Sequence, residues 1–146
     1  MDDKNFNNEV LYDLYKNAQI ALQSISNITG STEEVAMKQE LLNQYEGYEK
    51  MAGKIATLMM EYNITPKEPN ALKKAMLWGS IKMNTLTDNS CKHIAEMMIK
   101  GTVMGINELS SILNQKETML NVGITELTKE LLALEENYQE DLKKHL

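Results

Sequence analysis

The chain has 146 residues, of which 42% are apolar and 25% are charged. This composition is ordinary for a folded globular protein and argues against disorder, so we expect residues 1–146 to form a single domain. The formal net charge is −6, and all fifteen basic residues are lysines. Because arginine is the residue best suited to contact phosphates and base edges, this composition argues against nucleic-acid binding.

The cysteine count and the hydropathy of the chain indicate where the protein works. Cys91 is the single cysteine, which excludes an internal disulfide and fits a reducing compartment. No run of about twenty apolar residues is long enough to span a membrane, and no apolar signal region follows Met1. We therefore predict a cytoplasmic protein that does not associate with membranes.

Apolar residues recur in steps of three and four along four segments, which is the pattern of amphipathic helices. It predicts helices near residues 4–28, 31–62, 90–113 and 117–145. Gly30 follows the first segment at the place where glycine commonly ends a helix. Ser31-Thr-Glu-Glu34 matches a capping box, in which the hydroxyl and the glutamate bind free backbone N–H groups.

The stretch between the second and third predicted helices is long enough for a crossover. Asn63–Asn89 covers roughly 40 Å if it is mostly helical, about the length of the first helix. We expect a helix over about 67–87, then a break near Ser90, because the apolar stripe shifts there by one residue. One kinked helix from Asn70 to Leu113 is the alternative.

Two helical pairs joined by a long crossover form the ferritin-like connection. The predicted fold is therefore all-α: a ferritin-like up-down four-helix bundle with a long, partly helical crossover. The segments Lys82–Ser90 and His93–Met98, followed by Gly101-x-x-x-Gly105, also resemble small uncharacterised proteins of low-GC Gram-positive bacteria. This resemblance implies a fold and brings no activity with it.

A ferritin-like di-iron centre needs a glutamate on each of two helices and Glu-x-x-His on each of the other two. The chain has two histidines, and neither completes a Glu-x-x-His. The nearest substitutes are Glu46-x-x-Glu49 and the reversed His93-x-x-Glu96. The sequence therefore predicts no di-iron centre and no other cofactor, but one weakly bound metal ion is left open.

Predicted depth along the bundle divides the candidate metal ligands into two groups. Glu49 and Glu108 fall at one level. His93, Glu96 and Glu135 fall at another, roughly 18 Å away at 1.5 Å per residue. Neither group reaches the six ligands of a di-iron centre, and Glu108 can reach water at a frayed end of the bundle. The five candidates do not form one converged site.

Other chemically capable residues have a simpler structural interpretation. Tyr45, Tyr48 and Tyr138 lie on apolar faces, where tyrosines usually pack in the core and bond a polar partner. Gly101-x-x-x-Gly105 allows close backbone approach or leaves room for a large residue such as a tyrosine. Cys91 has no histidine–acid pair on its own face, so we expect no catalytic thiol.

Three functional hypotheses remain open from the sequence. The first is a bundle that acts by binding or assembly and is not an enzyme. The second is a metal-dependent oxidase or iron-handling protein with a degenerate site. The third is a helical adaptor for a protein partner that the sequence does not name. Surplus apolar residues favour a homo-oligomer: Leu77, Trp78, Ile81, Ile99, Ile106 and Leu113.

Overall fold

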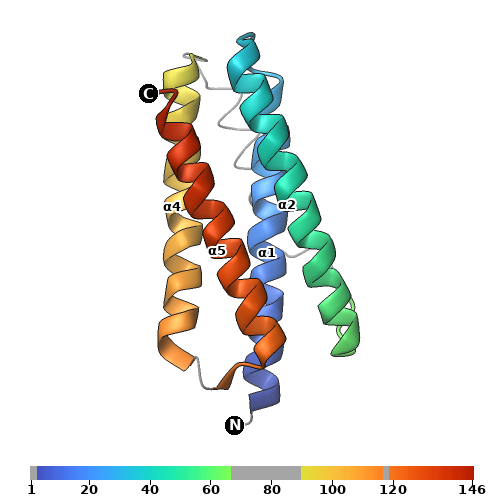
Figure 1. The fold of residues 1–146 in the computed structure, drawn as a ribbon. Coiled ribbons are helices and arrows are strands. Elements are labelled where there is room, and N and C mark those ends of the chain that lie inside the picture. The colour runs from blue at the N-terminus through green and yellow to red at the C-terminus, as the bar shows by residue number, and fades with distance from the viewer. Residues whose placement is uncertain (1–2, 67–89, 117–118) are drawn as a thin grey trace.

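The computed structural model describes residues 3–66, 90–116 and 119–146, and these contain four α-helices and no strand. The helices are α1 (Asp3–Thr29), α2 (Val35–Glu61), α4 (Cys91–Lys116) and α5 (Val122–Lys143). α1 and α5 run in one direction, and α2 and α4 run in the other (Figure 1). The predicted all-α, up-down four-helix bundle is therefore confirmed.

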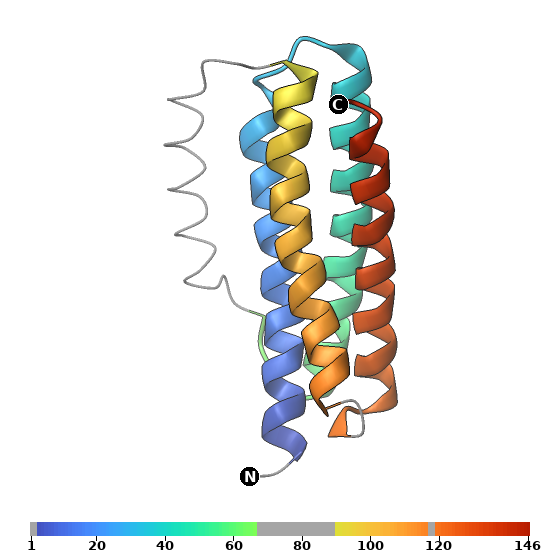
Figure 2. The ribbon, with the colours of Figure 1, turned by 90° about the vertical axis from the view of Figure 1, so that its left-hand side faces the viewer.

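The connection between the two hairpins has the layout that the sequence predicts. α2 ends and α4 begins at opposite ends of the bundle (Figures 1 and 2), as a long crossover requires. The predicted crossover helix at 67–87 lies outside the described residues. α4 begins afresh at Cys91, where Ser90 Oγ accepts a hydrogen bond from the N–H of His93 at 3.2 Å. The alternative of one helix running on through Ser90 is therefore wrong.

The predicted capping box at the start of the second helix is also wrong. α2 begins at Val35, after an N-cap residue, Glu34, that makes no capping bond with its side chain. Thr32 Oγ1 instead accepts from the N–H of Glu34 at 3.2 Å, and Thr32 is buried. The hydroxyl therefore stabilises a local turn between the helices, which is a common alternative for threonine.

The last helix begins five residues later than the predicted 117, and a buried asparagine bonds the backbone just before it. Asn7 Nδ2 donates to the carbonyl oxygen of Met119 at 3.0 Å, and Asn7 Oδ1 accepts from the N–H of Asn121 at 2.8 Å. Asn7 is 2% exposed. One side chain of α1 thus fixes the turn between α4 and α5 and the N-cap of α5, Asn121.

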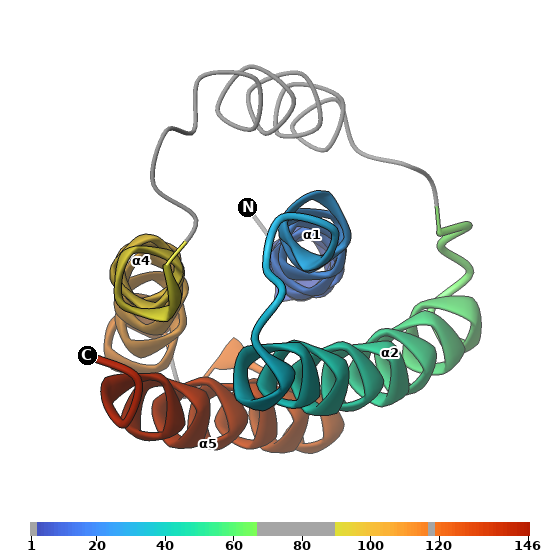
Figure 3. The same ribbon diagram turned by 90° about the horizontal axis from the view of Figure 1, so that it is seen from above.

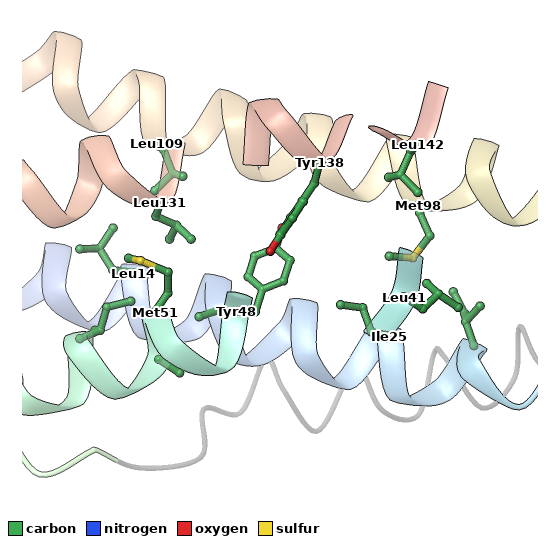
Figure 4. Packing of buried hydrophobic residues seen from close by; sticks show 14 of the residues in the cluster. Leu14, Ile25, Leu41, Tyr48, Met51, Met98, Leu109, Leu131, Tyr138 and Leu142 are labelled. Carbon is green, nitrogen blue, oxygen red and sulfur yellow. The ribbon is translucent and has the colours of Figure 1, made fainter. Parts of the chain in front are cut away.

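The four helices enclose one core, which is layered along the bundle axis (Figures 3 and 4). The first apolar layer consists of Leu14, Met51, Leu109 and Leu131. The second apolar layer consists of Ile25, Leu41, Met98 and Leu142. Between them lie Tyr48 and Tyr138 (Figure 4). With Glu135, which bonds Tyr48, and Asn17, which is close to Glu135, they form a polar middle layer. Among the described residues, no helix is long and apolar enough to cross a membrane.

Candidate functional site in the middle layer

The centre of the middle layer is a buried carboxyl group on α5. Glu135 is 2% exposed, and its Oε2 accepts a hydrogen bond from the Tyr48 hydroxyl of α2 at 2.8 Å. Burial raises the pKa of Glu135 to about 7, because desolvation disfavours the charged form. The Tyr48 hydrogen bond and the Asn17 amide lower this pKa, and the Glu108 carboxylate raises it. Glu135 is therefore a proton-binding group near neutral pH.

The second oxygen of this carboxyl group is less well satisfied. Glu135 Oε1 has no hydrogen-bond partner in the described part of the chain, although Asn17 lies close enough to lower the pKa. Glu108 on α4 is half-buried, and burial raises its pKa, with Lys16 lowering it and Asp13 raising it. Lys16 Nζ and Asp13 Oδ1, both on α1, lie 3.7 Å apart. Charged groups of α1 and α4 thus continue from Glu135 toward the surface.

Two tyrosine rings pack against each other in the layer. The rings of Tyr48 and Tyr138 have centroids 5.4 Å apart and are tilted by 54° (Figure 4). The Tyr138 hydroxyl donates to the carbonyl oxygen of Asn43 at 3.3 Å. Burial raises the pKa of Tyr138 to about 12 and that of Tyr48 well above its usual range. Both phenols therefore stay protonated near neutral pH and act as hydrogen-bond donors.

Two glycines on neighbouring helices make room for the polar side chains of α5. A Cβ atom on Gly105 of α4 would lie 2.8 Å from both carboxyl oxygens of Glu135. A Cβ atom on Gly47 of α2 would overlap the hydroxyl oxygen of Tyr138. The interpretation of the Gly101–Gly105 motif as making room is right for Gly105, but the occupant is a carboxyl group. The tyrosine lies against Gly47 instead.

The structure brings Glu108 and Glu135 together, contrary to the predicted depths. Glu135 lies opposite Gly105, whereas the prediction placed it level with Glu96. α4 continues to Lys116 and α5 begins only at Val122. The turn is therefore centred about four residues later than predicted, and opposed residues shift by about twice that, because the displacement counts on both helices.

The other predicted ligands lie apart from this pair. Glu49 follows Tyr48 in the chain but is exposed, so its side chain points away from the middle layer. Glu96 is exposed and His93 is half-buried, both in the first two turns of α4. Within residues 3–66, 90–116 and 119–146, no three His, Cys, Asp or Glu side chains are grouped so that they could hold a metal ion.

The donor set of the middle layer does not fit a di-iron centre. Such a centre needs histidines from two helices and four carboxylates at one level. Here α5 carries Glu135-x-x-Tyr138, and the other groups are one phenol, one amide and the half-buried Glu108. Sequence reasoning missed Asn17 and the bond between Tyr48 and Glu135. The spacing of Glu135 and Tyr138, together with Gly47 and Gly105, was the available signal.

The cysteine lies at the end of the bundle, away from the middle layer. Cys91 Sγ donates to Glu34 Oε2 at 2.8 Å. Burial and this carboxylate raise the pKa of the thiol to about 11. Because the thiolate is the nucleophilic form, a thiol of this kind is poorly reactive.

The interface between the hairpins carries two shallow grooves between α2 and α5. Their volumes are about 330 and 310 Å³. Leu58 and Leu127 line the first, and Met51 and Leu134 line the second. The Lys54–Glu130 ion pair joins the two helices with an N–O distance of 2.5 Å.

Comparison with known proteins supports the fold. No model of a known protein family matches the chain, and no curated protein matches its sequence. A solved structure that is similar is a dodecameric thioferritin, the bacterioferritin-related protein from Bacteroides fragilis. The TM-score is 0.65 at 16% sequence identity, over 92% of this chain and 84% of that one. The chain therefore has the ferritin-like fold.

Proposed function

We propose that this protein is a ferritin-like bundle that acts by binding or assembly in the cytoplasm, and that it is not a di-iron enzyme. The observation that carries the proposal is the occupied middle layer. Glu135 and Tyr138 of α5 and Tyr48 of α2 fill it, and two of them lie directly against glycine backbone. Tyrosine stands where Glu-x-x-His would place a histidine, so the layer lacks the nitrogen ligands of a di-iron centre.

Metal analysis of freshly purified protein tests this proposal. We expect less than one iron per chain, and no saturable binding of two equivalents when Fe²⁺ is added under anaerobic conditions. Two irons per chain, both lost in Glu108→Ala and in Glu135→Ala, would contradict the proposal. Glu49→Ala is the matched control, because this carboxylate is exposed on α2 and points away from the layer.

We also propose that the protein assembles with copies of itself. Large apolar side chains are exposed on α2, α4 and α5, including Val35 at 81%, Met104 at 73% and Val122 at 74%. Such residues often mark interfaces, and the similar thioferritin is dodecameric. The apolar residues that led the sequence analysis to predict a homo-oligomer give weaker support, because Ile99, Ile106 and Leu113 are only half-exposed. The other apolar residues behind that prediction, at positions 77, 78 and 81, lie outside the described residues.

Light scattering across a hundredfold range of protein concentration tests the assembly. We expect a mass that is a multiple of 16.6 kDa and that falls when Met104→Glu or Val35→Glu is introduced. Leu109→Met is a suitable control, since this side chain is buried in the core. A strict monomer at the highest concentration would contradict the proposal.

The alternative is a metal-dependent oxidase or iron-handling protein with a degenerate site, and one observation favours it. In the described part of the chain, Glu135 Oε1 is buried without a hydrogen-bond partner, and the Glu108 carboxylate is close enough to raise the pKa of Glu135. A site of this kind would hold one weakly bound ion, and its oxygen ligands suit Mn²⁺ or Mg²⁺. Calorimetric titration with Mn²⁺ would show one site that Glu135→Gln removes. Absence of any heat would argue against this alternative.

A further inference from the structure

The alignment of the two hairpins is not determined by their apolar residues alone. Short turns fix α1 against α2 and α4 against α5, but no short turn joins α2 to α5. Buried residues on α2 and α5 recur every seven positions: Leu41, Tyr48 and Ile55, and Ile124, Leu131 and Tyr138. A slide of one helix by seven residues would keep apolar faces together, as in coiled coils whose register is unspecified.

We propose that the middle layer is a register lock, a set of core side chains that disfavours other alignments of the two hairpins and acts alongside the Asn7 contact at the end of the bundle. The lock consists of Tyr48 and Gly47 of α2 and of Glu135 and Tyr138 of α5. Its role is to exclude other alignments rather than to add stability. This inference concerns how the hairpins pack, so it goes beyond the proposed function. If the inference is wrong, the proposed function is unaffected.

Gly47 provides the steric part of the lock. Tyr138 lies where only a glycine of α2 leaves room for its hydroxyl. Seven residues to either side of Gly47 stand Glu40 and Lys54, whose side chains would meet the phenol after a slide. Gly105 lies under Glu135 within the second hairpin, so a slide between the hairpins leaves that contact unchanged. Of the three positions compared on α2, only position 47 carries a glycine, so only the observed alignment leaves room for Tyr138.

The buried hydrogen bond provides the electrostatic part. In the observed alignment the Tyr48 hydroxyl donates to Glu135 at 2.8 Å in the core. After a slide of seven residues, Glu135 would face the levels of Leu41 or Ile55, which offer no donor. A buried carboxyl group without a donor is strongly disfavoured. Buried polar groups that select one register at little gain in stability are known in coiled coils.

Cross-linking between α2 and α5 tests the lock in a Cys91→Ser background. The native reporter pair is Lys54→Cys with Glu130→Cys, at the positions of the observed ion pair. The displaced reporters join Lys54→Cys with Gly123→Cys or with Asn137→Cys, each seven residues from Glu130. A thiol cross-linker shorter than about 10 Å, the rise of seven helical residues, distinguishes these pairs.

The decisive variant replaces the lock with apolar residues, Tyr48→Phe with Glu135→Leu. With the lock intact we expect cross-linking of the native pair alone. In the variant the displaced pairs should cross-link at a yield raised at least about tenfold, because the penalty of an unpaired buried carboxyl group is gone. Its urea midpoint should be no lower than that of the parent.

Two outcomes would overturn the proposal. One is a variant that still cross-links only through the native pair. The other is a variant that does not fold, which would show that the layer supplies stability and not alignment. Met51→Leu with Leu131→Met is the matched control, because it exchanges side chains of the first apolar layer and should keep the native pair alone. Gly47→Ala should also raise the displaced yield, whereas Gly53→Ala, with open space around it, should not.

Discussion

The apolar layers and the middle layer of the same core are built on different principles. The apolar layers consist of aliphatic and methionine side chains that repeat along each helix, so each layer resembles the next. The middle layer instead depends on a hydrogen bond between α2 and α5 and on two glycines at the observed positions. The apolar layers stabilise the fold by burial, which is non-directional. The middle layer specifies how the helices are aligned. Stability and specificity are therefore placed in different residues of one core.

The largest expected effect comes from an apolar layer. Leu131→Ala should lower the free energy of unfolding by about 3–4 kcal/mol, because it removes a fully buried side chain and leaves a cavity. Urea unfolding followed by circular dichroism measures it. Leu42→Ala is the control, since Leu42 is 51% exposed and should change stability by less than about 0.5 kcal/mol. Equal effects of the two would remove the distinction between core and surface.

Removing the charge of the middle layer should raise the free energy of unfolding instead of lowering it. Folding raises the pKa of Glu135 from 4.5 to about 7, so the folded state binds the proton more tightly. Stability should therefore fall as pH rises from about 4.5 to 7 and stay low above that range. Glu135→Gln cannot ionise and should be more stable than the parent at pH 8 by about 2–3 kcal/mol.

Unfolding free energies measured at pH 5 and pH 8 check this prediction. The difference should shrink to less than about 1 kcal/mol at pH 5, where the folded Glu135 carboxyl group is mostly protonated. Some pH dependence should persist in the variant, because burial also raises the pKa of Glu108 and of Asp13. Parallel pH profiles for parent and variant would show that Glu135 does not titrate in this range.

The fold could be predicted from the sequence because it depends on repeating features. Steps of three and four in the apolar residues locate all four helices, and the length of the crossover predicts the directions in which they run. The boundaries at Val35 and Val122 could not be predicted, because each depends on a single side chain. Thr32 bonds a backbone N–H within the turn, and Asn7 bonds a turn more than a hundred residues away.

The candidate site was harder to predict than the fold, because depth along a bundle depends on where the turns lie. An error of a few residues in the turn before Val122 separated Glu108 from Glu135 in the prediction. The identity of the middle layer depends on contacts among Asn17, Tyr48 and Glu135, which belong to three helices. No local pattern records such contacts. The resemblance to proteins of low-GC Gram-positive bacteria stays a prediction.

Loss of the buried hydrogen bond should have a smaller effect that depends on pH. Tyr48→Phe removes the donor to Glu135 and should cost about 1–2 kcal/mol at pH 8, where the carboxylate would be left unpaired. The cost should shrink at pH 5, because a protonated carboxyl group needs the donor less. Since the Tyr48 bond lowers the pKa of Glu135, carboxyl titration followed by NMR should show a higher pKa in the variant. An unchanged pKa would contradict the role given to this bond.

The smallest expected effect compares two glycines on one helix. Gly101 and Gly105 are one turn apart on α4, and alanine is favoured over glycine in a helix by up to about 1 kcal/mol. Gly101 has open space where a Cβ would lie, so Gly101→Ala should gain most of that amount. A Cβ on Gly105 would lie 2.8 Å from the Glu135 oxygens, so Gly105→Ala should displace a buried carboxyl group and lose about 1 kcal/mol. In a Glu135→Ala background this clash is absent, and Gly105→Ala should then gain stability as Gly101→Ala does. Thermal unfolding of the single and double variants measures this coupling, and equal effects of Gly105→Ala in both backgrounds would show that Glu135 does not require a glycine beneath it.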